Sequence, residues 1–143
     1  MTTIGSNSTC AIDQIVVALK LALLDPESMY RKTKNSRYLL AYCKELFPEL
    51  LSRETRTFYA CMKALLGKHV KSMEDAEQTF PLFRRLIPSM FKRGSFGAIP
   101  IHYFQMRRLF EHHDDMQVQA YADDLFRKTR AEIRDAKKEK QSR

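Results

Sequence analysis

Apolar residues recur three and four positions apart along almost the whole chain, which is the spacing of one buried face of an α-helix. The most regular stretch runs from about Asp115 to Ile133. Its apolar stripe is Val118, Tyr121, Ala122, Leu125, Phe126, Thr129 and Ile133. No segment shows the period-two alternation of a half-buried strand. The pattern therefore predicts an all-α protein, a compact bundle of six to seven short helices.

Capping and helix-breaking residues indicate where these helices begin and end. Asp25-Pro26 is expected to end the first helix, Pro48 to break the second, and Gly67 to end the third as a left-handed cap. Pro81 and Pro88 are expected to interrupt the following segment, with helix resuming after each, because proline is tolerated in a first turn. The residues expected to begin helices are Ser8 or Thr9, Ser36, Ser52, Ser72, Pro100, and Asp114 or Asp115.

The run from Ala11 to Leu24 is very apolar, yet it contains Asp13, Gln14 and Lys20. A transmembrane helix needs about 20 apolar residues, and this run is only about 14 residues long. We therefore expect a deeply buried central helix and no transmembrane segment.

The expected organisation is one helical domain with polar ends. Residues 1–9 are predicted to be disordered, residues 10–136 to form the domain, and residues 137–143 to form a basic tail. Within the domain, residues 10–78 supply the N-terminal helices and residues 79–136 form a three-helix unit.

The charge balance favours acidic partners. The chain of 143 residues has 25 Lys and Arg against 17 Asp and Glu, a formal net charge of +8. Such a surface attracts RNA, an anionic membrane face or an acidic protein, without selecting among them.

The cysteines Cys10, Cys43 and Cys61 form no Cys-x-x-Cys pair. Cys43 and Cys61 lie on apolar stripes, so we interpret both as reduced thiols of the core. This interpretation favours a reducing compartment, such as the cytosol or the mitochondrial matrix.

The sequence shows no assembled catalytic set. It has no Gly-x-Ser-x-Gly motif, no phosphate-binding loop and no cysteine with a neighbouring base. His112-His113 beside Asp114-Asp115 is explained by a helix end followed by a helix cap, since neighbouring helical positions point about 100° apart and do not converge on a metal. We predict that the protein is not an enzyme.

Three features follow one another in the second half of the chain. Leu82-Phe83-Arg84 is an apolar-aromatic-Arg triplet, and Arg107-Arg108-Leu109-Phe110 contains Arg-x-x-Phe one helix later. An amphipathic helix follows over residues 115–134. This order resembles the LYR-motif family of small mitochondrial proteins over residues 79–136, with Phe83 where the family has Tyr.

The resemblance implies a function in binding. Members of the family are three-helix proteins, mostly accessory subunits or assembly factors of mitochondrial complexes, and many bind mitochondrial acyl carrier protein. Their arginines face the acidic carrier and its phosphopantetheine phosphate, while the acyl chain enters the helical bundle. The partner-binding residues implied here are Leu82, Phe83, Arg84, Arg85, Arg107, Arg108, Phe110 and Leu125.

The sequence thus predicts a helical adaptor or accessory subunit of a mitochondrial complex, either a respiratory complex or the mitoribosome, in the matrix. No intrinsic cofactor is expected, and acyl-phosphopantetheine would arrive with a bound acyl carrier protein. The alternatives are a basic all-α protein that binds RNA or the ribosome, or a small viral helical regulatory protein, with a cytoplasmic location.

Overall fold

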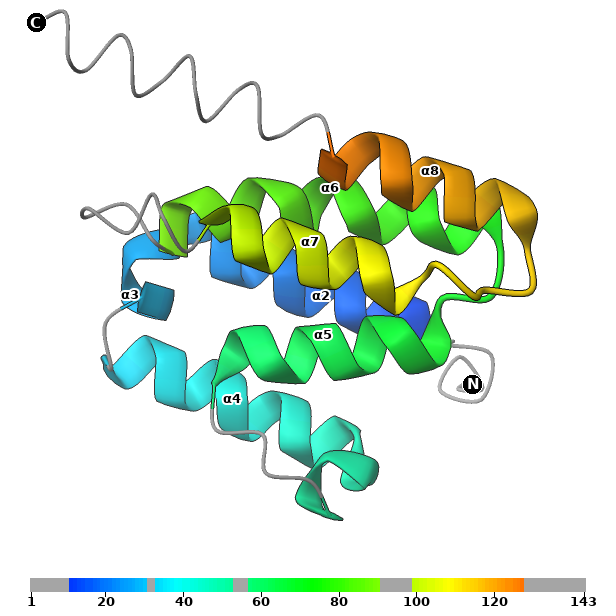
Figure 1. Cartoon of the computed structure of the whole chain (residues 1–143). Helices are drawn as coiled ribbons and strands as arrows, with labels where there is room; N and C mark the ends of the chain where they lie inside the picture. The colour runs from blue at the N-terminus through cyan, green and yellow to red at the C-terminus, as the bar shows by residue number, and fades with distance from the viewer. Residues whose placement is uncertain (1–10, 31–32, 53–56, 91–98, 128–143) are drawn as a thin grey trace, which may run out of the picture. The chain divides into compact units, whose positions relative to one another are not determined.

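Every regular element is helical within residues 11–30, 33–52, 57–90 and 99–127, which the computed structural model describes. The elements in chain order are α2 (Ala11–Leu24), α3 (Pro26–Tyr30), α4 (Lys34–Leu46), the 3-10 helix η1 (Pro48–Ser52), α5 (Phe58–His69), α6 (Met73–Met90), α7 (Ile99–Leu109) and α8 (Met116–Arg127) (Figure 1). The all-α prediction is confirmed. The predicted disordered segment 1–9 and basic tail 137–143 lie outside the described residues.

Contacts divide the chain into two units, Met1–Met90 and Phe91–Arg143. The first unit contains α2 to α6 and the second contains α7 and α8. Helix α6, which opens the three-helix unit predicted for residues 79–136, packs within the first unit against α2 and α3.

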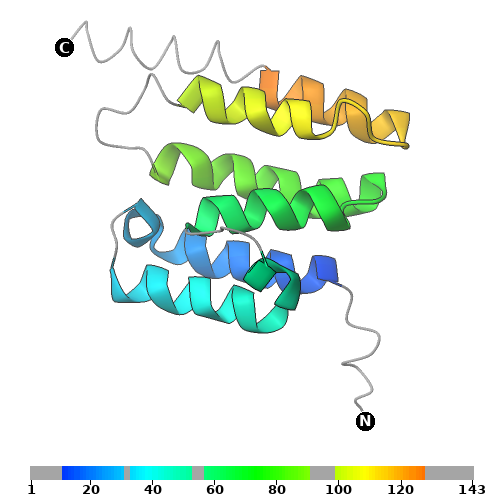
Figure 2. The same ribbon diagram turned by 60° about the horizontal axis from the view of Figure 1, so that its bottom comes forward.

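Helix α2 lies at the centre of the first unit, where it packs against α3, α4, α5 and α6 (Figure 2). It spans the apolar run found in the sequence. Its buried residues are Ile12, Ile15, Ala18, Leu19 and Ala22. Their spacing of three and four positions places them on one face, so burial of this face holds the unit together. Among the described residues, no helix is both long and apolar enough to cross a lipid bilayer.

Two threonines cap the helices that follow. Thr33 Oγ1 accepts a hydrogen bond from Ser36 N, so α4 begins at Lys34 rather than at Ser36. Thr57 Oγ1 accepts from Ala60 N at 3.1 Å and caps α5. The prediction that Ser52 begins this helix is wrong, because Ser52 is the last residue of the preceding 3-10 helix η1.

The predicted helix end at Gly67 is also wrong. Gly67 lies inside α5, and the cap is Val70 in an extended conformation. The Val70 N–H donates to Leu66 O at 3.1 Å, and both side chains are buried. Apolar packing one turn beyond the glycine therefore outweighs the cost of about 1 kcal/mol that glycine imposes in a helix.

Helix α6 runs without a break from Met73 to Met90 through both Pro81 and Pro88, so the expected interruption is wrong. Each interior proline removes a main-chain hydrogen bond and costs about 3 kcal/mol. The helix persists because its apolar face is buried on both sides of Pro81. That face consists of Ala76, Phe80, Phe83, Leu86 and Ile87.

In its described residues, 99–127, the second unit consists of two helices joined by a turn. Tyr103 on α7 and Phe126 on α8 are buried, and their ring centroids are 5.9 Å apart. In the turn, the Asp115 N–H donates to His113 Nδ1 at 2.9 Å, which places the proton of neutral His113 on Nε2. Asp115 Oδ1 accepts from Gln117 N at 2.8 Å, as expected of the cap of the last helix.

Candidate partner-binding surface

The predicted triplet lies on α6 in the first unit. Phe83 is fully buried, and its ring stacks on Tyr59 with centroids 5.5 Å apart. Leu82 and Arg84 are half-buried, whereas Arg85 is exposed. Phe83 thus contributes to the core of the first unit, and the two arginines are the charged groups of this segment that a partner can reach.

The other predicted residues lie in the second unit. Arg107 on α7 is half-buried and Arg108 is exposed. Phe110, which directly follows α7, is buried, and Leu125 on α8 is half-buried. The eight predicted residues therefore divide evenly between the two units.

Phe104 is an exposed aromatic residue on α7, next to two arginines of the predicted partner-binding set. The guanidinium carbon of Arg107 lies 5.1 Å from the centroid of this ring, and that of Arg108 lies 5.9 Å away. Both distances are typical of cation–π contacts. Phe104 is 41% exposed. We call Phe104, Arg107 and Arg108 the arginine–aromatic surface.

Sequence reasoning did not single out Phe104, although the signal was present. Arg107 and Arg108 follow Phe104 by three and four positions, the two spacings that bring side chains together on a helix. What the sequence did not indicate was whether this face of α7 is exposed or buried.

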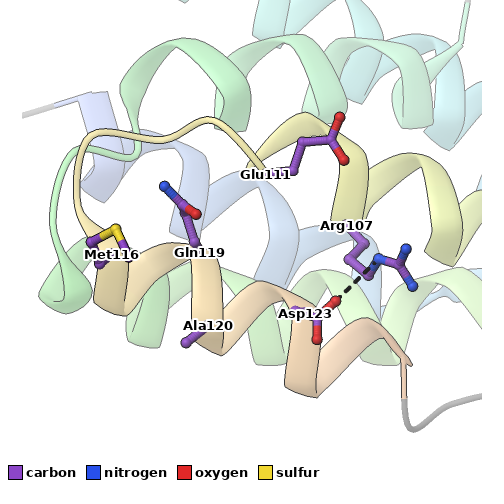
Figure 3. Close-up of a pocket in the computed structure, with 6 residues that line it drawn as sticks. All are labelled: Arg107, Glu111, Met116, Gln119, Ala120 and Asp123. Atoms are coloured by element: carbon purple, nitrogen blue, oxygen red, sulfur yellow. Dashed lines mark ion pairs between the residues drawn. The ribbon is translucent and has the colours of Figure 1, made fainter.

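An ion pair orients Arg107. Its Nε lies 3.2 Å from Asp123 Oδ1 on α8, and Asp123 Oδ2 lies 3.7 Å from Arg127 Nε. Figure 3 shows the remaining two guanidinium nitrogens of Arg107 pointing away from Asp123. The pair therefore orients the side chain through one edge, and its other edge points away from Asp123.

A shallow hollow of about 320 Å³ lies beside this ion pair. It is lined by Arg107, Glu111, Met116, Gln119, Ala120 and Asp123 (Figure 3). Met116 is 74% exposed, so the hollow combines charged groups with an open apolar side chain. Mixed, open surfaces of this kind are typical of the rim of a protein interface rather than of an enclosed small-molecule site.

The groups of this region can bind oxyanions and apolar surfaces. Guanidinium groups donate in a fork that matches carboxylate and phosphate oxygens, and the exposed ring offers an apolar face. Among the described residues, no three His, Cys, Asp or Glu side chains come together in a way that would hold a metal ion.

Comparisons of the chain with protein-family models, with curated proteins and with solved structures give no match. The residues of the chain and their geometry therefore carry the functional inference.

Proposed function

We propose that this protein is a non-enzymatic helical adaptor that binds an acidic protein partner. The observation that carries the proposal is the arginine–aromatic surface on α7, where the exposed Phe104 ring contacts the guanidinium groups of both Arg107 and Arg108. Arginine and aromatic residues are the types enriched in protein interfaces. The formal net charge of +8 adds a long-range attraction for an acidic partner.

The partner implied by the resemblance to LYR-motif proteins is an acyl carrier protein. In this form of the proposal the protein is an accessory subunit of a mitochondrial complex in the matrix. Arg84 and Arg85 on α6, and Arg107 and Arg108 on α7, would bind acidic side chains of the carrier and the phosphate of its phosphopantetheine. The exposure of Arg85 and Arg108 supports this assignment.

Co-purification of the full chain with an acylated carrier tests the proposal. Wild type should retain the carrier, and Arg84→Glu and the double variant Arg107→Glu/Arg108→Glu should each lose it, because removing one partner of a desolvated charge pair costs about 2–5 kcal/mol. Lys71→Glu is the control for Arg84→Glu, since it makes the same charge change at an exposed position just before α6. A wild type that retains no carrier refutes this partner. Loss of binding in the Lys71 control as well would show that net charge, not the assigned surface, drives retention.

The exposed face of Phe104 also fits a second candidate function, RNA binding. Bases stack on exposed aromatic rings, and neighbouring arginines neutralise phosphates. Salt distinguishes the two functions. RNA affinity should fall log-linearly with salt because phosphate contacts release counterions, whereas carrier affinity should depend on the length of the acyl chain. Retention of RNA that Phe104→Ala abolishes would favour the RNA-binding function.

A further inference from the structure

Exposed apolar residues are concentrated on two neighbouring helices of the first unit. Among the described residues, eight large apolar side chains are exposed, and five of them lie on α2 and α4. These five are Val17, Leu21, Leu24, Tyr38 and Tyr42. Single exposed apolar residues are common on protein surfaces, but a concentration of them marks an interaction site.

The helical spacing brings these residues together in two stripes. On α2 they recur at Val17, Leu21 and Leu24, and on α4 at Tyr38 and Tyr42. Leu24 is 80% exposed and Tyr38 is 69% exposed, the two highest values in the stripes. Helices α2 and α4 pack against each other, and Leu21 and Leu24 of α2 line one hollow with Tyr38 of α4, so the two stripes meet at one surface of the first unit.

The surface is concave where the two helices meet. A hollow of about 330 Å³ lies between Leu21 and Leu24 of α2, Met29 of α3, and Tyr38 and Leu39 of α4. A second hollow of about 310 Å³ adjoins it on α4, since Tyr38 lines both. We call this surface the α2–α4 groove.

Hydrogen bonds fix the connection between the two helices. The buried Ser28 donates through Oγ to Asp25 O at 2.9 Å, and Thr33 Oγ1 donates to Ser28 O at 3.2 Å. Thr33 also caps α4. The groove is therefore preformed, which lowers the entropic cost of binding a partner.

The rim of the groove is positively charged. Lys34 and Arg37 line the second hollow beside Tyr38. Lys20 precedes Leu24 by four positions on α2, a spacing that places the two side chains on the same face of the helix. Within the part of the chain that the structure describes, none of these three cations forms an ion pair. Asp25 is the one acidic residue lining either hollow, and its Oδ2 accepts from Asn35 Nδ2 at 3.4 Å.

We infer that the α2–α4 groove binds an amphipathic helix of a partner protein whose apolar face is flanked by Asp and Glu. The inference extends the proposed adaptor function with a second surface, which uses none of the residues of the arginine–aromatic surface. A groove between two packed helices accepts the apolar residues of a third helix at positions i, i+3, i+4 and i+7. The cations at the rim select acidic flanks.

Other occupants fit the groove less well. A second copy of this chain would bring Lys34 and Arg37 close to the same cations, and like charges at an interface are unfavourable. An anionic membrane prefers a long convex apolar face, whereas this apolar surface is hollowed between two helices.

Panning a displayed library of helical peptides against the full chain tests the inference. Enriched peptides should carry large apolar residues at helical spacing with Asp and Glu beside them. The tightest peptide, labelled with a fluorophore, is then titrated with the wild type and variants. Leu24→Ser and Tyr38→Ser should each weaken binding by about tenfold or more, as expected for the loss of one interface anchor. Both side chains are exposed, so neither variant should alter the circular dichroism spectrum.

Charge reversal and a matched control complete the experiment. Lys34→Glu/Arg37→Glu should shift the library towards peptides with Lys and Arg flanks. Leu109→Ser, which removes an exposed apolar side chain in the second unit, should leave the affinity unchanged. Enrichment of basic or non-helical peptides, or equal binding by wild type and Tyr38→Ser, would overturn the inference.

Two further measurements test the other occupants. A concentration-dependent dimer that Tyr38→Ser dissociates would assign the groove to a second copy. Binding to phosphatidylserine vesicles that Leu24→Ser abolishes, with no peptide enriched, would assign it to a membrane. Either result would overturn the inference about the groove and would leave the assignment of Arg107 and Arg108 unchanged. Conversely, the carrier-binding results for Arg107→Glu/Arg108→Glu test the proposed function and not the groove.

Discussion

The ring of Phe83 stacks on the ring of Tyr59 with centroids 5.5 Å apart and planes inclined by 22°, which joins α6 to α5. Offset stacking of this kind adds about 0.5–1.5 kcal/mol to the burial of the two side chains. Burial also raises the pKa of the Tyr59 hydroxyl well above its usual range. The aromatic member of the triplet thus stabilises the first unit, and its neighbour Arg84 is left half-buried at the surface.

Phe83→Ala should destabilise the protein by about 3–5 kcal/mol, because it removes a fully buried ring and leaves a cavity. Urea denaturation followed by circular dichroism measures this change. Arg85→Ala, an exposed position on the same helix, should change stability by less than about 0.5 kcal/mol. Equal losses in the two variants would contradict the burial of Phe83.

Arg107 and Asp123 should show weak energetic coupling across α7 and α8. Their side chains are 29% and 45% exposed, so solvent screens the 3.2 Å ion pair. A double-mutant cycle with Arg107→Ala and Asp123→Ala should give about 0.2–1 kcal/mol. A coupling well above this range would show that the pair is a structural clamp and not an orienting contact.

Thr57→Ala should cost about 1 kcal/mol of stability, because the Ala60 N–H then loses its acceptor at the start of α5. Thr57→Ser keeps the hydroxyl and should remain within a few tenths of a kcal/mol of the wild type. Thermal denaturation of the three proteins measures the difference. If the serine variant is as unstable as the alanine variant, the hydroxyl is not the stabilising group.

Burial raises the pKa of the Cys43 thiol to about 12, and the nearby Cys61 adds to the shift. The folded chain keeps a proton that the unfolded chain releases above about pH 9, so stability should fall as the pH rises from about 9 towards about 12. Cys43→Ala should reduce this loss of stability with rising pH, measured by denaturation at several pH values.

In the folded protein, a thiol reagent at mildly alkaline pH should leave Cys43 and Cys61 unmodified, since both are buried and the thiolate is the reactive form. Rapid labelling of either thiol without unfolding would contradict their burial.

The carboxyl of Glu49 should make the stability of the protein depend on pH in the acidic range. A backbone hydrogen bond, followed by contacts with His69 at 3.0 Å and Lys68 at 3.4 Å, lowers the pKa of its carboxyl. A lowered folded pKa contributes stability that is present above the unfolded value and is lost as the pH falls through the folded one. Denaturation of Glu49→Gln should therefore show a weaker loss on acidification than wild type.

The sequence predicted local features well where one strong signal was present. The Ala11–Leu24 helix follows from its apolar spacing, and the Asp115 cap of α8 follows from acid at a helix start. The helix end proposed at Gly67 failed because the burial of Leu66 and Val70 outweighed the cost of glycine within a helix. The helix start proposed at Ser52 failed because Ser52 is the last residue of η1 and Thr57 caps α5. The uninterrupted course of α6 through Pro81 has the same cause, since its apolar face packs on α2.

The sequence indicated which arginines belong to the candidate site, but it did not indicate which side chains around them are exposed. The arginines of the triplet segment and of α7 were found from motifs, and their joint contact with one partner stays a prediction. Phe104 and the α2–α4 groove were not found, because helical spacing defines a face without indicating whether another helix covers it. Leu21 and Leu24 continue an apolar run that sequence reasoning placed in the core, yet both are exposed.

By itself, the sequence determined the helical class, the positive charge and the position of the central helix, since periodicity and charge are local or additive properties of a chain. Only the tertiary structure decided that Phe83 stacks on Tyr59, that Arg107 pairs with Asp123, and that Leu24 and Tyr38 stay exposed. The physical reason is that such contacts join residues distant in sequence. Their energies depend on which helices pack together and not on the spacing within any one of them.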